Sequence, residues 1–295
     1  MTNHSDIRIG TLVPHAKAAD YIRQVLPHGF ESFQLFIWEK FAAGVDLKQM
    51  APEVLAACGD KAVVSSIGMF GNPLQNDVTL ECWRKSIDAA KSYNCDLVCG
   101  FAGALDGKPV PEALPRFKQV WGELATRAED NGVRIGFENC DMGGTWDRAA
   151  WNIAHAPSAF EMLWDAVPSK ALGIEWEPCH HMGSLVEPLP LLRKLAASGK
   201  LFHVHGKDAT VAWDVVREYG TRGGKQWVWH RHPGFGDTNW TDVISILRQH
   251  NYKGFIDIEG WHDPVYKGDL EMTGQVHALN YLKQCRGGAY VPNPK

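Results

Sequence analysis

Short apolar segments alternate along the chain with longer segments in which apolar residues recur every three or four positions. The apolar segments predict eight β-strands, at Ile7–Val13, Ser32–Phe36, Ala62–Ile67, Leu97–Ala102, Arg134–Asn139, Ala171–Trp176, Leu201–His205 and Phe255–Glu259. The longer segments predict eight helices, at Ala16–Leu26, Leu47–Cys58, Leu80–Tyr93, Glu112–Asn131, Ala159–Val167, Pro190–Ala197, Trp240–His250 and Leu270–Cys285.

The regular alternation of strands and helices predicts a parallel sheet, because parallel neighbours are joined by a crossover connection. Eight such units in a chain of 295 residues predict a closed (β/α)8 barrel, the TIM barrel, as a single domain over residues 1–295. A doubly wound open sheet is the alternative. That fold usually has a glycine-rich turn after its first strand, whereas Val13-Pro14-His15 follows here.

The connection between the seventh strand and its helix is much longer than the others. It contains a loop insertion at about residues 209–237, which includes Trp213, Trp227 and Trp229. Long loops in compact domains are often functional lids, and exposed tryptophan is costly. We therefore expect this loop to fold over the mouth of the barrel, or against a second subunit in a homo-oligomer.

Composition and charge narrow the classes of partner. The formal net charge is −4, whereas nucleic-acid-binding proteins usually have a basic excess. There is no apolar run of the ~18 residues that cross a membrane, and Met1 to Arg8 lack the apolar core of a signal peptide. The seven cysteines form no CxxC pair, as in a protein with reduced thiols. We expect a cytoplasmic protein with no nucleic-acid or membrane partner.

Ligand-type side chains lie at or directly after the carboxyl ends of four successive predicted strands. They are Glu138, Glu177, His205 and Glu259. The carboxyl ends of barrel strands meet at one rim, where three carboxylates would repel one another without a cation. Three carboxylates and one imidazole suit Mn²⁺, Mg²⁺, Co²⁺ or Zn²⁺, so we predict one divalent metal ion. Glu175, two residues before Glu177 on the same strand face, is the alternative ligand from the sixth strand.

Four segments resemble the metal-site motifs of the xylose-isomerase-like TIM barrel superfamily. They are Phe137-Glu138-Asn139, Glu177-Pro178-Cys179-His180, His205-Gly206-Lys207-Asp208 and Ile258-Glu259. The segment from Arg231 to Gly236, followed by Trp240, is similar to the superfamily's loop before the last helix. Ketose 3-epimerases, hydroxypyruvate isomerases, inosose dehydratases and the endonuclease IV repair enzymes belong to this superfamily.

The resemblance implies roles for the matched residues. It makes Glu138, Glu177, His205 and Glu259 the metal ligands, and it places His180 and Arg231 against the substrate. The superfamily generally has Asp where this chain has Glu177, and related epimerases often have Glu where it has Gly144. Lys207 is a candidate to polarise a substrate oxygen. Apolar walls for a sugar are expected from tryptophans near strand ends, namely Trp38, Trp146, Trp176 and Trp261.

A divalent metal among carboxylates suits a substrate with a hydroxyl group beside a carbonyl. The metal would stabilise an enediolate, while Glu138 and Glu259, on opposite sides of the substrate, remove and return a proton. Return to the same carbon is epimerisation, and return to the neighbouring carbon is isomerisation. Loss of a leaving group is the reaction of a lyase or dehydratase on a keto-sugar, keto-glycoside or inosose.

The sequence leaves these three outcomes open, and we expect a divalent-metal-dependent sugar isomerase or epimerase, with the lyase as the alternative. The substrate class is a small carbohydrate or polyol without phosphate, because the last two strand ends show no phosphate-binding cluster. Two other classes of function are further alternatives. One is a DNA-repair endonuclease with several zinc ions, and the other is a metal-stabilised binding protein without catalysis.

Overall fold

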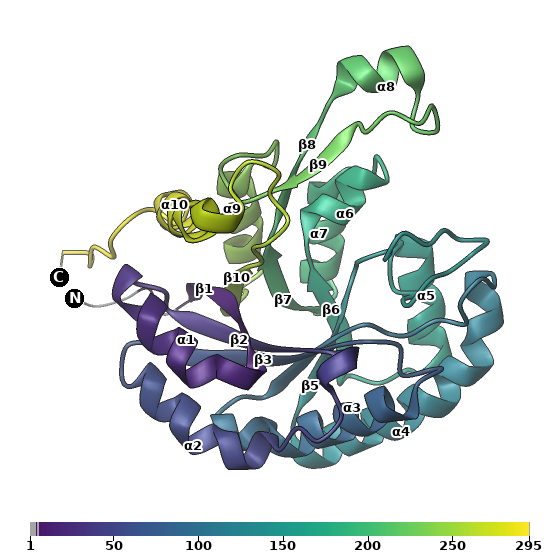
Figure 1. Ribbon diagram of the computed structural model, residues 1–295, viewed down its shortest axis with the longest axis horizontal. Helices are drawn as coiled ribbons and strands as arrows, with labels where there is room; N and C mark the ends of the chain where they lie inside the picture. Colours follow the sequence, from purple (N-terminus) through teal and green to yellow (C-terminus); the bar gives the residue numbers. More distant parts are fainter. Residues whose placement is uncertain (1–3, 5, 295) are drawn as a thin grey trace.

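The computed structural model describes residue 4 and residues 6–294, and it confirms the predicted (β/α)8 barrel. Eight parallel strands close in the order β1-β10-β7-β6-β5-β4-β3-β2 (Figure 1). Their bounds are β1 Ile7–Pro14, β2 Ser32–Trp38, β3 Val63–Phe70, β4 Leu97–Gly100, β5 Arg134–Glu138, β6 Leu172–Trp176, β7 Leu201–Gly206 and β10 Gly254–Ile258. Each overlaps one of the strands expected from the sequence.

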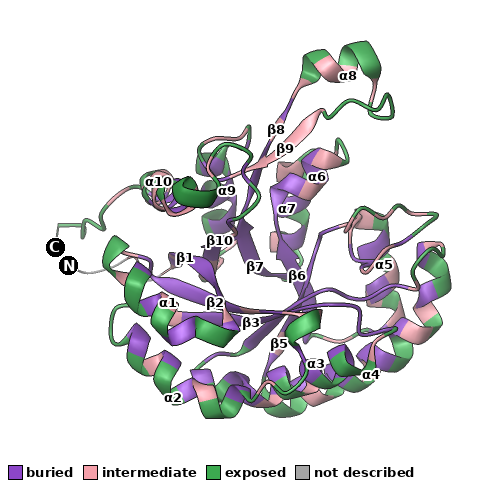
Figure 2. Cartoon of the chain, viewed as in Figure 1, coloured by how far each residue is buried: buried purple, intermediate pink, exposed green. Residues whose placement is uncertain are grey.

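Helices surround the barrel. They are α1 Ala18–Val25, α2 Leu47–Cys58, α3 Asp77–Ala89, α4 Leu114–Asn131, α5 Pro157–Ala166, α6 Pro178–Gly183, α7 Pro188–Ala197, α9 Trp240–Gln249 and α10 Glu271–Cys285. Short 3₁₀ turns occupy His15–Lys17, Leu26–His28, Glu39–Phe41, Ala90–Tyr93, Val110–Ala113 and Gly268–Leu270. Figure 2 shows buried strands inside and helices whose exposed residues face outward. No helix of the described residues is long and apolar enough to cross a bilayer.

One shifted helix start and one additional helix have local causes. Helix α3 begins three residues earlier than expected, because the Asn76 side chain accepts hydrogen bonds from the backbone amides of Val78 and Thr79. Helix α6 is only six residues long, which is too short for a periodic pattern to reveal. It starts with Pro178 directly after Glu177, so the end of β6 turns at once into a helix.

The apolar core lies between the strands and the helices, and the barrel interior is polar. Trp83, Trp121 and Phe137 pack edge to face in the outer layer. Inside the barrel, Asp257 accepts hydrogen bonds from Ser32 and Ser65. These interior groups are fully buried and hydrogen-bonded to one another, which offsets the cost of removing them from water.

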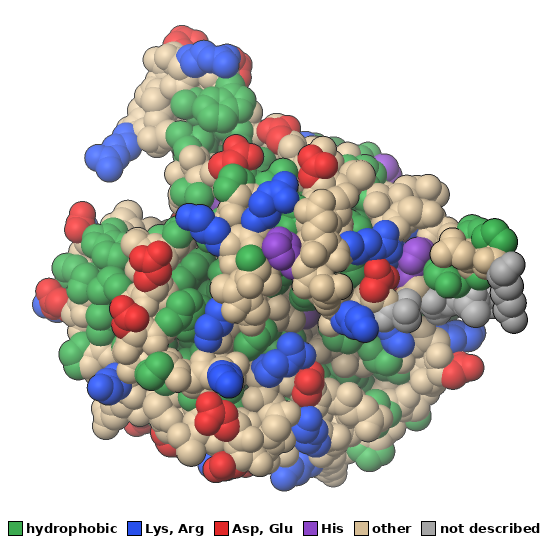
Figure 3. Space-filling model, turned by 180° about the vertical axis from the view of Figure 1, so that it is seen from behind, with side chains coloured by type: hydrophobic (Ala, Val, Ile, Leu, Met, Phe, Trp, Pro, Cys, Tyr) green, Lys and Arg blue, Asp and Glu red, His purple; other side chains and the backbone are tan. Residues whose placement is uncertain are grey.

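The connection after β7 is a projecting arm. Strands β8 (Asp208–Val211) and β9 (Val228–Arg231) pair antiparallel, and α8 (Trp213–Tyr219) lies between them. The arm leads away from the barrel (Figure 1), and Figure 3 shows hydrophobic side chains on its surface. The tip of the arm lies away from the barrel (Figure 1), where Trp213 is 50% exposed, whereas Val228 and His230 near its base line the cavity described below. The sequence analysis expected a loop without strands here, because two four-residue strands carry no clear local signal.

Candidate metal centre

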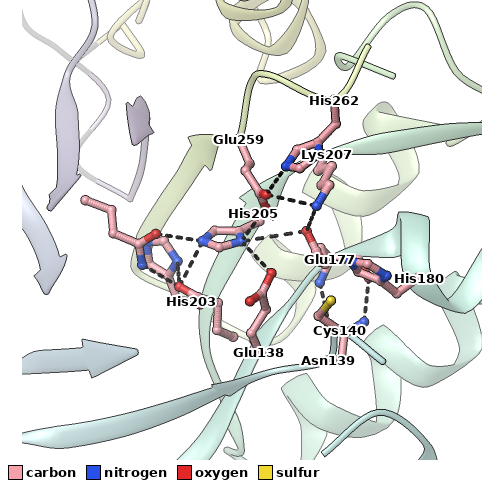
Figure 4. A network of polar contacts seen from close by, with 12 residues as sticks. Glu138, Asn139, Cys140, Glu177, His180, His203, His205, Lys207, Glu259 and His262 are labelled. Carbon is pink, nitrogen blue, oxygen red and sulfur yellow. Dashed lines mark hydrogen bonds and ion pairs between the residues drawn. The ribbon is translucent and has the colours of Figure 1, made fainter. Parts of the chain in front are cut away.

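The four predicted ligands converge at the carboxyl ends of the strands (Figure 4). Glu138 is the last residue of β5, His205 lies in β7, and Glu177 and Glu259 directly follow β6 and β10. One ligand atom from each residue lies within 4.8 Å of those from the other three. Barrel closure produces this convergence, because it brings the ends of β5, β6, β7 and β10 around one point.

The donor atoms fit a single divalent cation. His205 Nδ1 lies 3.2 Å from Glu259 Oε2, 3.6 Å from Glu138 Oε1 and 3.7 Å from Glu177 Oε2. Both Glu177 oxygens, His205 Nδ1 and Glu259 Oε2 are buried and have no hydrogen-bonding partner in suitable geometry among the described residues. Buried polar atoms rarely stay unpartnered, so lone pairs directed at a common point are typical of a metal site.

The orientation of His205 is fixed from below by Gln34. The amide oxygen of Gln34 lies 2.7 Å from His205 Nε2, while its amide nitrogen donates to Ser66 Oγ at 2.7 Å and to Glu175 Oε1 at 2.5 Å. This arrangement assigns the ring proton to Nε2 and leaves the Nδ1 lone pair facing the carboxylates. Hydrogen bonds of this kind set the tautomer of metal-binding histidines. The sequence analysis missed Gln34.

The side chains of Glu175 and Glu177 point in different directions. Glu175 lies deeper in the barrel, with Oε1 2.9 Å from His203 Nδ1 and 3.1 Å from His205 Nε2. Burial opposes its ionisation, yet the electrostatic and hydrogen-bonding contacts with His205 and His203 lower the pKa of Glu175 to about 2. His203 also contacts Asp257 at 2.9 Å. Glu175 therefore supports His205 from below, and Glu177 faces the centre.

Lys207 is a buried partner of the carboxylates. Its Nζ donates to Glu259 Oε1 at 2.9 Å and lies 3.8 Å from Glu177 Oε2. Three carboxylates and one ammonium group leave a formal charge of −2, which one divalent cation neutralises. The neighbouring carboxylate of Asp208 points away from the centre and accepts hydrogen bonds from Thr238 and Trp240.

The electrostatic environment separates the two candidate catalytic carboxylates. Burial and the charge of Glu177 raise the pKa of Glu138 well above its usual value. Burial also opposes the ionisation of Glu259, but Lys207 outweighs it and holds the pKa of Glu259 well below its usual value. A cation at the centre would oppose the upward shift of Glu138. In the metal-free protein, the two carboxylates therefore differ in proton affinity.

Three histidines lie on the mouth side of the centre. His180 Nε2 is 2.7 Å from Glu177 Oε1, and His262 Nε2 is 2.9 Å from Glu259 Oε1. The ring of His230 lies 5.0 Å from that of His180. Burial and the charge of Lys207 lower the pKa of His230 to about 3, so its imidazole is neutral. Sequence reasoning placed only His180 here, although His262 follows Glu259 at the spacing with which His180 follows Glu177.

Asn139 fixes the backbone of Glu177. Its side chain donates to the Glu177 carbonyl oxygen at 2.9 Å and accepts from the Glu177 amide at 2.7 Å. These two bonds join the end of β5 to the end of β6 and set the point from which the Glu177 side chain extends. The sequence analysis quoted Asn139 within a motif but gave it no function.

A cavity of about 790 Å³ opens onto the centre. Glu138, Glu259, His180, Lys207 and Trp38, all predicted site residues, line it. Because the cavity reaches the candidate ligands directly, a substrate bound in it would contact them.

Two residues predicted to bind substrate lie elsewhere. Arg231 donates to Asp263 Oδ2 at 2.9 Å, because alternation along β9 directs its neighbour His230 into the cavity and Arg231 away from it. Trp176 is fully buried, since β6 directs Glu175 inward and Trp176 toward the outer helices. Trp146 also packs against the outer core.

The barrel and its rim of carboxylates define a class of protein, and comparison with known proteins identifies it. The chain matches the Xylose isomerase-like TIM barrel family over residues 22–285 and belongs to that family. It is also similar to Uncharacterized protein MJ1311 of Methanocaldococcus jannaschii, with 28% identity over 186 residues. That match covers 62% of this chain and 56% of the relative's length.

Solved structures share the fold at low sequence identity. The 3-keto-D-glucoside 4-epimerase YcjR of E. coli is 14% identical with a TM-score of 0.69, over 95% of this chain and 100% of that chain. The mannonate dehydratase of Streptococcus suis is 11% identical with a TM-score of 0.72, over 96% and 94%. A D-tagatose 3-epimerase-like protein is 20% identical with a TM-score of 0.67, over 94% and 96%. These likenesses show that the chain shares the fold of these proteins over nearly its whole length.

Proposed function

We propose that the protein is a divalent-metal-dependent sugar isomerase or epimerase that removes a proton from a carbon next to a carbonyl group. The observation that carries the proposal is the position of Glu138 and Glu259 on opposite sides of a shared ligand cluster. They extend from β5 and β10, which β6 and β7 separate. A substrate held at the cluster would meet one carboxylate on each side.

The chain's own groups supply the proton transfers. One carboxylate takes the proton from the substrate carbon, and the carboxylate on the other side returns a proton. Lys207 and His262, both 2.9 Å from Glu259 Oε1, hold that carboxylate in place. A bound divalent cation would act as a Lewis acid that polarises the carbonyl and stabilises the negative charge of the enediolate.

The same first step permits elimination, so a lyase acting on a keto-sugar is the second candidate. The likeness to a mannonate dehydratase supports it at the level of the fold. The two candidates differ in product: an isomerase or epimerase returns the proton, whereas a lyase releases water or an alcohol.

Deuterium incorporation tests the proposal. The protein, stripped of metal and then loaded with Mn²⁺, is incubated with a panel of keto-sugars in heavy water and followed by NMR. We expect deuterium at the carbon beside the carbonyl, and loss of this exchange in Glu138→Gln and Glu259→Gln. Glu161→Gln, on the exposed face of α5, serves as the control that keeps activity. Turnover without label at that carbon, or full activity in both site variants, contradicts the mechanism.

A further inference from the structure

The cavity has two chemically different halves, which come from two halves of the barrel. The polar half carries the ligand cluster at the ends of β5, β6, β7 and β10. The other half is an aromatic wall formed by Phe36 and Trp38 of β2, Phe70 of β3, Phe101 after β4 and Trp261 after β10. The wall presents no charged group, whereas a bare sugar carries hydroxyl groups on all sides that need polar partners.

The aromatic wall is continuous and begins beside the candidate metal centre. The ring of Phe70 lies 6.3 Å from that of His205, 5.4 Å from Phe101 and 5.6 Å from Trp38. Tilted and edge-to-face contacts at these distances are those of a packed aromatic cluster. A group bound against Phe70 and Trp38 would therefore lie close enough to a sugar at the ligand cluster to be joined to it by a short covalent link.

Trp261 extends the wall to the mouth in a strained conformation. Its φ angle is +68°, a left-handed value that bulky residues rarely adopt. A hydrogen bond of 2.9 Å from its amide to Glu271 Oε1 holds this backbone, and its ring packs 5.5 Å from Phe36. The indole is 43% exposed. Strain that holds an apolar side chain at the opening of a cavity is typical of a ligand contact.

The size of the cavity agrees with a ligand larger than one sugar ring. Pockets of ~300–1,000 Å³ bury drug-sized ligands, which exceed a single hexose. The cavity here, at about 790 Å³, leaves its aromatic half free when a hexose lies at the ligand cluster.

We propose that the substrate is a keto-sugar that carries an aromatic substituent, an aryl glycoside, with the sugar at the ligand cluster and the aryl group on the aromatic wall. This inference rests on the proposed function for the position of the sugar. It assigns Trp38 and Trp261 to substrate specificity.

A matched pair of ligands tests this inference. The methyl and 4-nitrophenyl glycosides of one keto-hexose differ only in the substituent, and their Kd values for the Mn²⁺-loaded protein are measured by calorimetry. Burial of an aromatic ring predicts a Kd about 30-fold or more lower for the aryl glycoside. In Trp38→Ala and Trp261→Ala, the ratio of the two Kd values should fall at least about tenfold. Trp213→Ala, on the distant arm, is the control that keeps the ratio.

Equal affinity for the two glycosides, or an unchanged ratio in the folded Trp261→Ala variant, overturns the inference. Because Trp261 is partly exposed, its replacement is expected to leave the fold intact, and circular dichroism checks this. The proposed function is tested separately. Tight, Trp261-dependent binding of the aryl glycoside without deuterium exchange would refute proton abstraction while it supports the aromatic subsite.

Discussion

Replacing Lys207 by methionine should weaken the metal-free protein and increase the stabilisation that a cation provides. Methionine keeps the length and apolar stem of the side chain but removes the charge 2.9 Å from Glu259 Oε1. Lys207 is only 4% exposed, so water cannot replace its ammonium group. The three carboxylates of the centre then face one another without a positive partner from Lys207.

Removing one partner of a buried ion pair costs about 3–5 kcal/mol, because the other charge stays buried without compensation. We therefore expect the free energy of unfolding of metal-free Lys207→Met to fall by about that amount. The local formal charge falls from −2 to −3, so a divalent cation is attracted more strongly. A tenfold lower Kd would add about 1.4 kcal/mol to the stabilisation at saturating Mn²⁺.

Urea unfolding with and without Mn²⁺, followed by tryptophan fluorescence, measures both quantities, and calorimetry gives the Kd directly. Lys118→Met, at an exposed position of α4, is the matched control and should behave as the parent protein. The interpretation fails if metal-free Lys207→Met is as stable as the parent. It also fails if Mn²⁺ stabilises the variant less than the parent, since the ammonium group would then assist cation binding.

Three further predictions concern other parts of the chain. Gln34→Leu removes the acceptor at His205 Nε2 and should raise the Kd for Mn²⁺ by about tenfold, measured by competition with a chelator. Glu31 forms a bidentate pair with Arg286, and although burial opposes its ionisation, Arg286 lowers its pKa. The stability that this pair provides is therefore present above the unfolded-state pKa and is lost as the pH falls through the lower folded-state value. Glu31→Gln should flatten the acid side of the pH–stability curve, and an unchanged acid limb contradicts the role. Replacing residues 212–227 by a short glycine-containing turn should leave the melting temperature nearly unchanged, because the tip of the arm has no buried side chain.

The fold was predictable because the alternation of short apolar runs with amphipathic segments is a local property of the sequence. Each strand of the barrel is a short apolar run, and strand order follows from the succession of units. The candidate ligands were predictable for a related reason: Glu138, Glu177, His205 and Glu259 lie at the carboxyl ends of strands that must meet at one rim. Their closeness in space follows from the order of strands and helices, which the sequence itself indicates.

Other parts of the site depend on contacts across the barrel that no local pattern reveals. Gln34 lies in β2 and reaches His205 of β7 only through the barrel interior, and nothing in its neighbourhood in sequence marks it. Trp176 and Arg231 alternate with Glu175 and His230 along their strands, so their side chains point away from the site. Phe70 and Phe101 were not among the predicted site residues, and only the closed barrel places them on a cavity wall.

The position of the arm bears on how the sequence of this protein can vary during evolution. The chain leaves the rim at Asp208 and returns at its ladder partner Arg231, so the excursion begins and ends at one place. Insertions or deletions between these two points leave the closure of the barrel unchanged, and lengthening such a segment costs little entropy. The tip can therefore be rebuilt to suit new surroundings while the ligand cluster keeps its geometry. The freedom to vary is therefore greatest at the tip of the arm, whereas His230 near its base belongs to the cavity wall and is held to the geometry of the site.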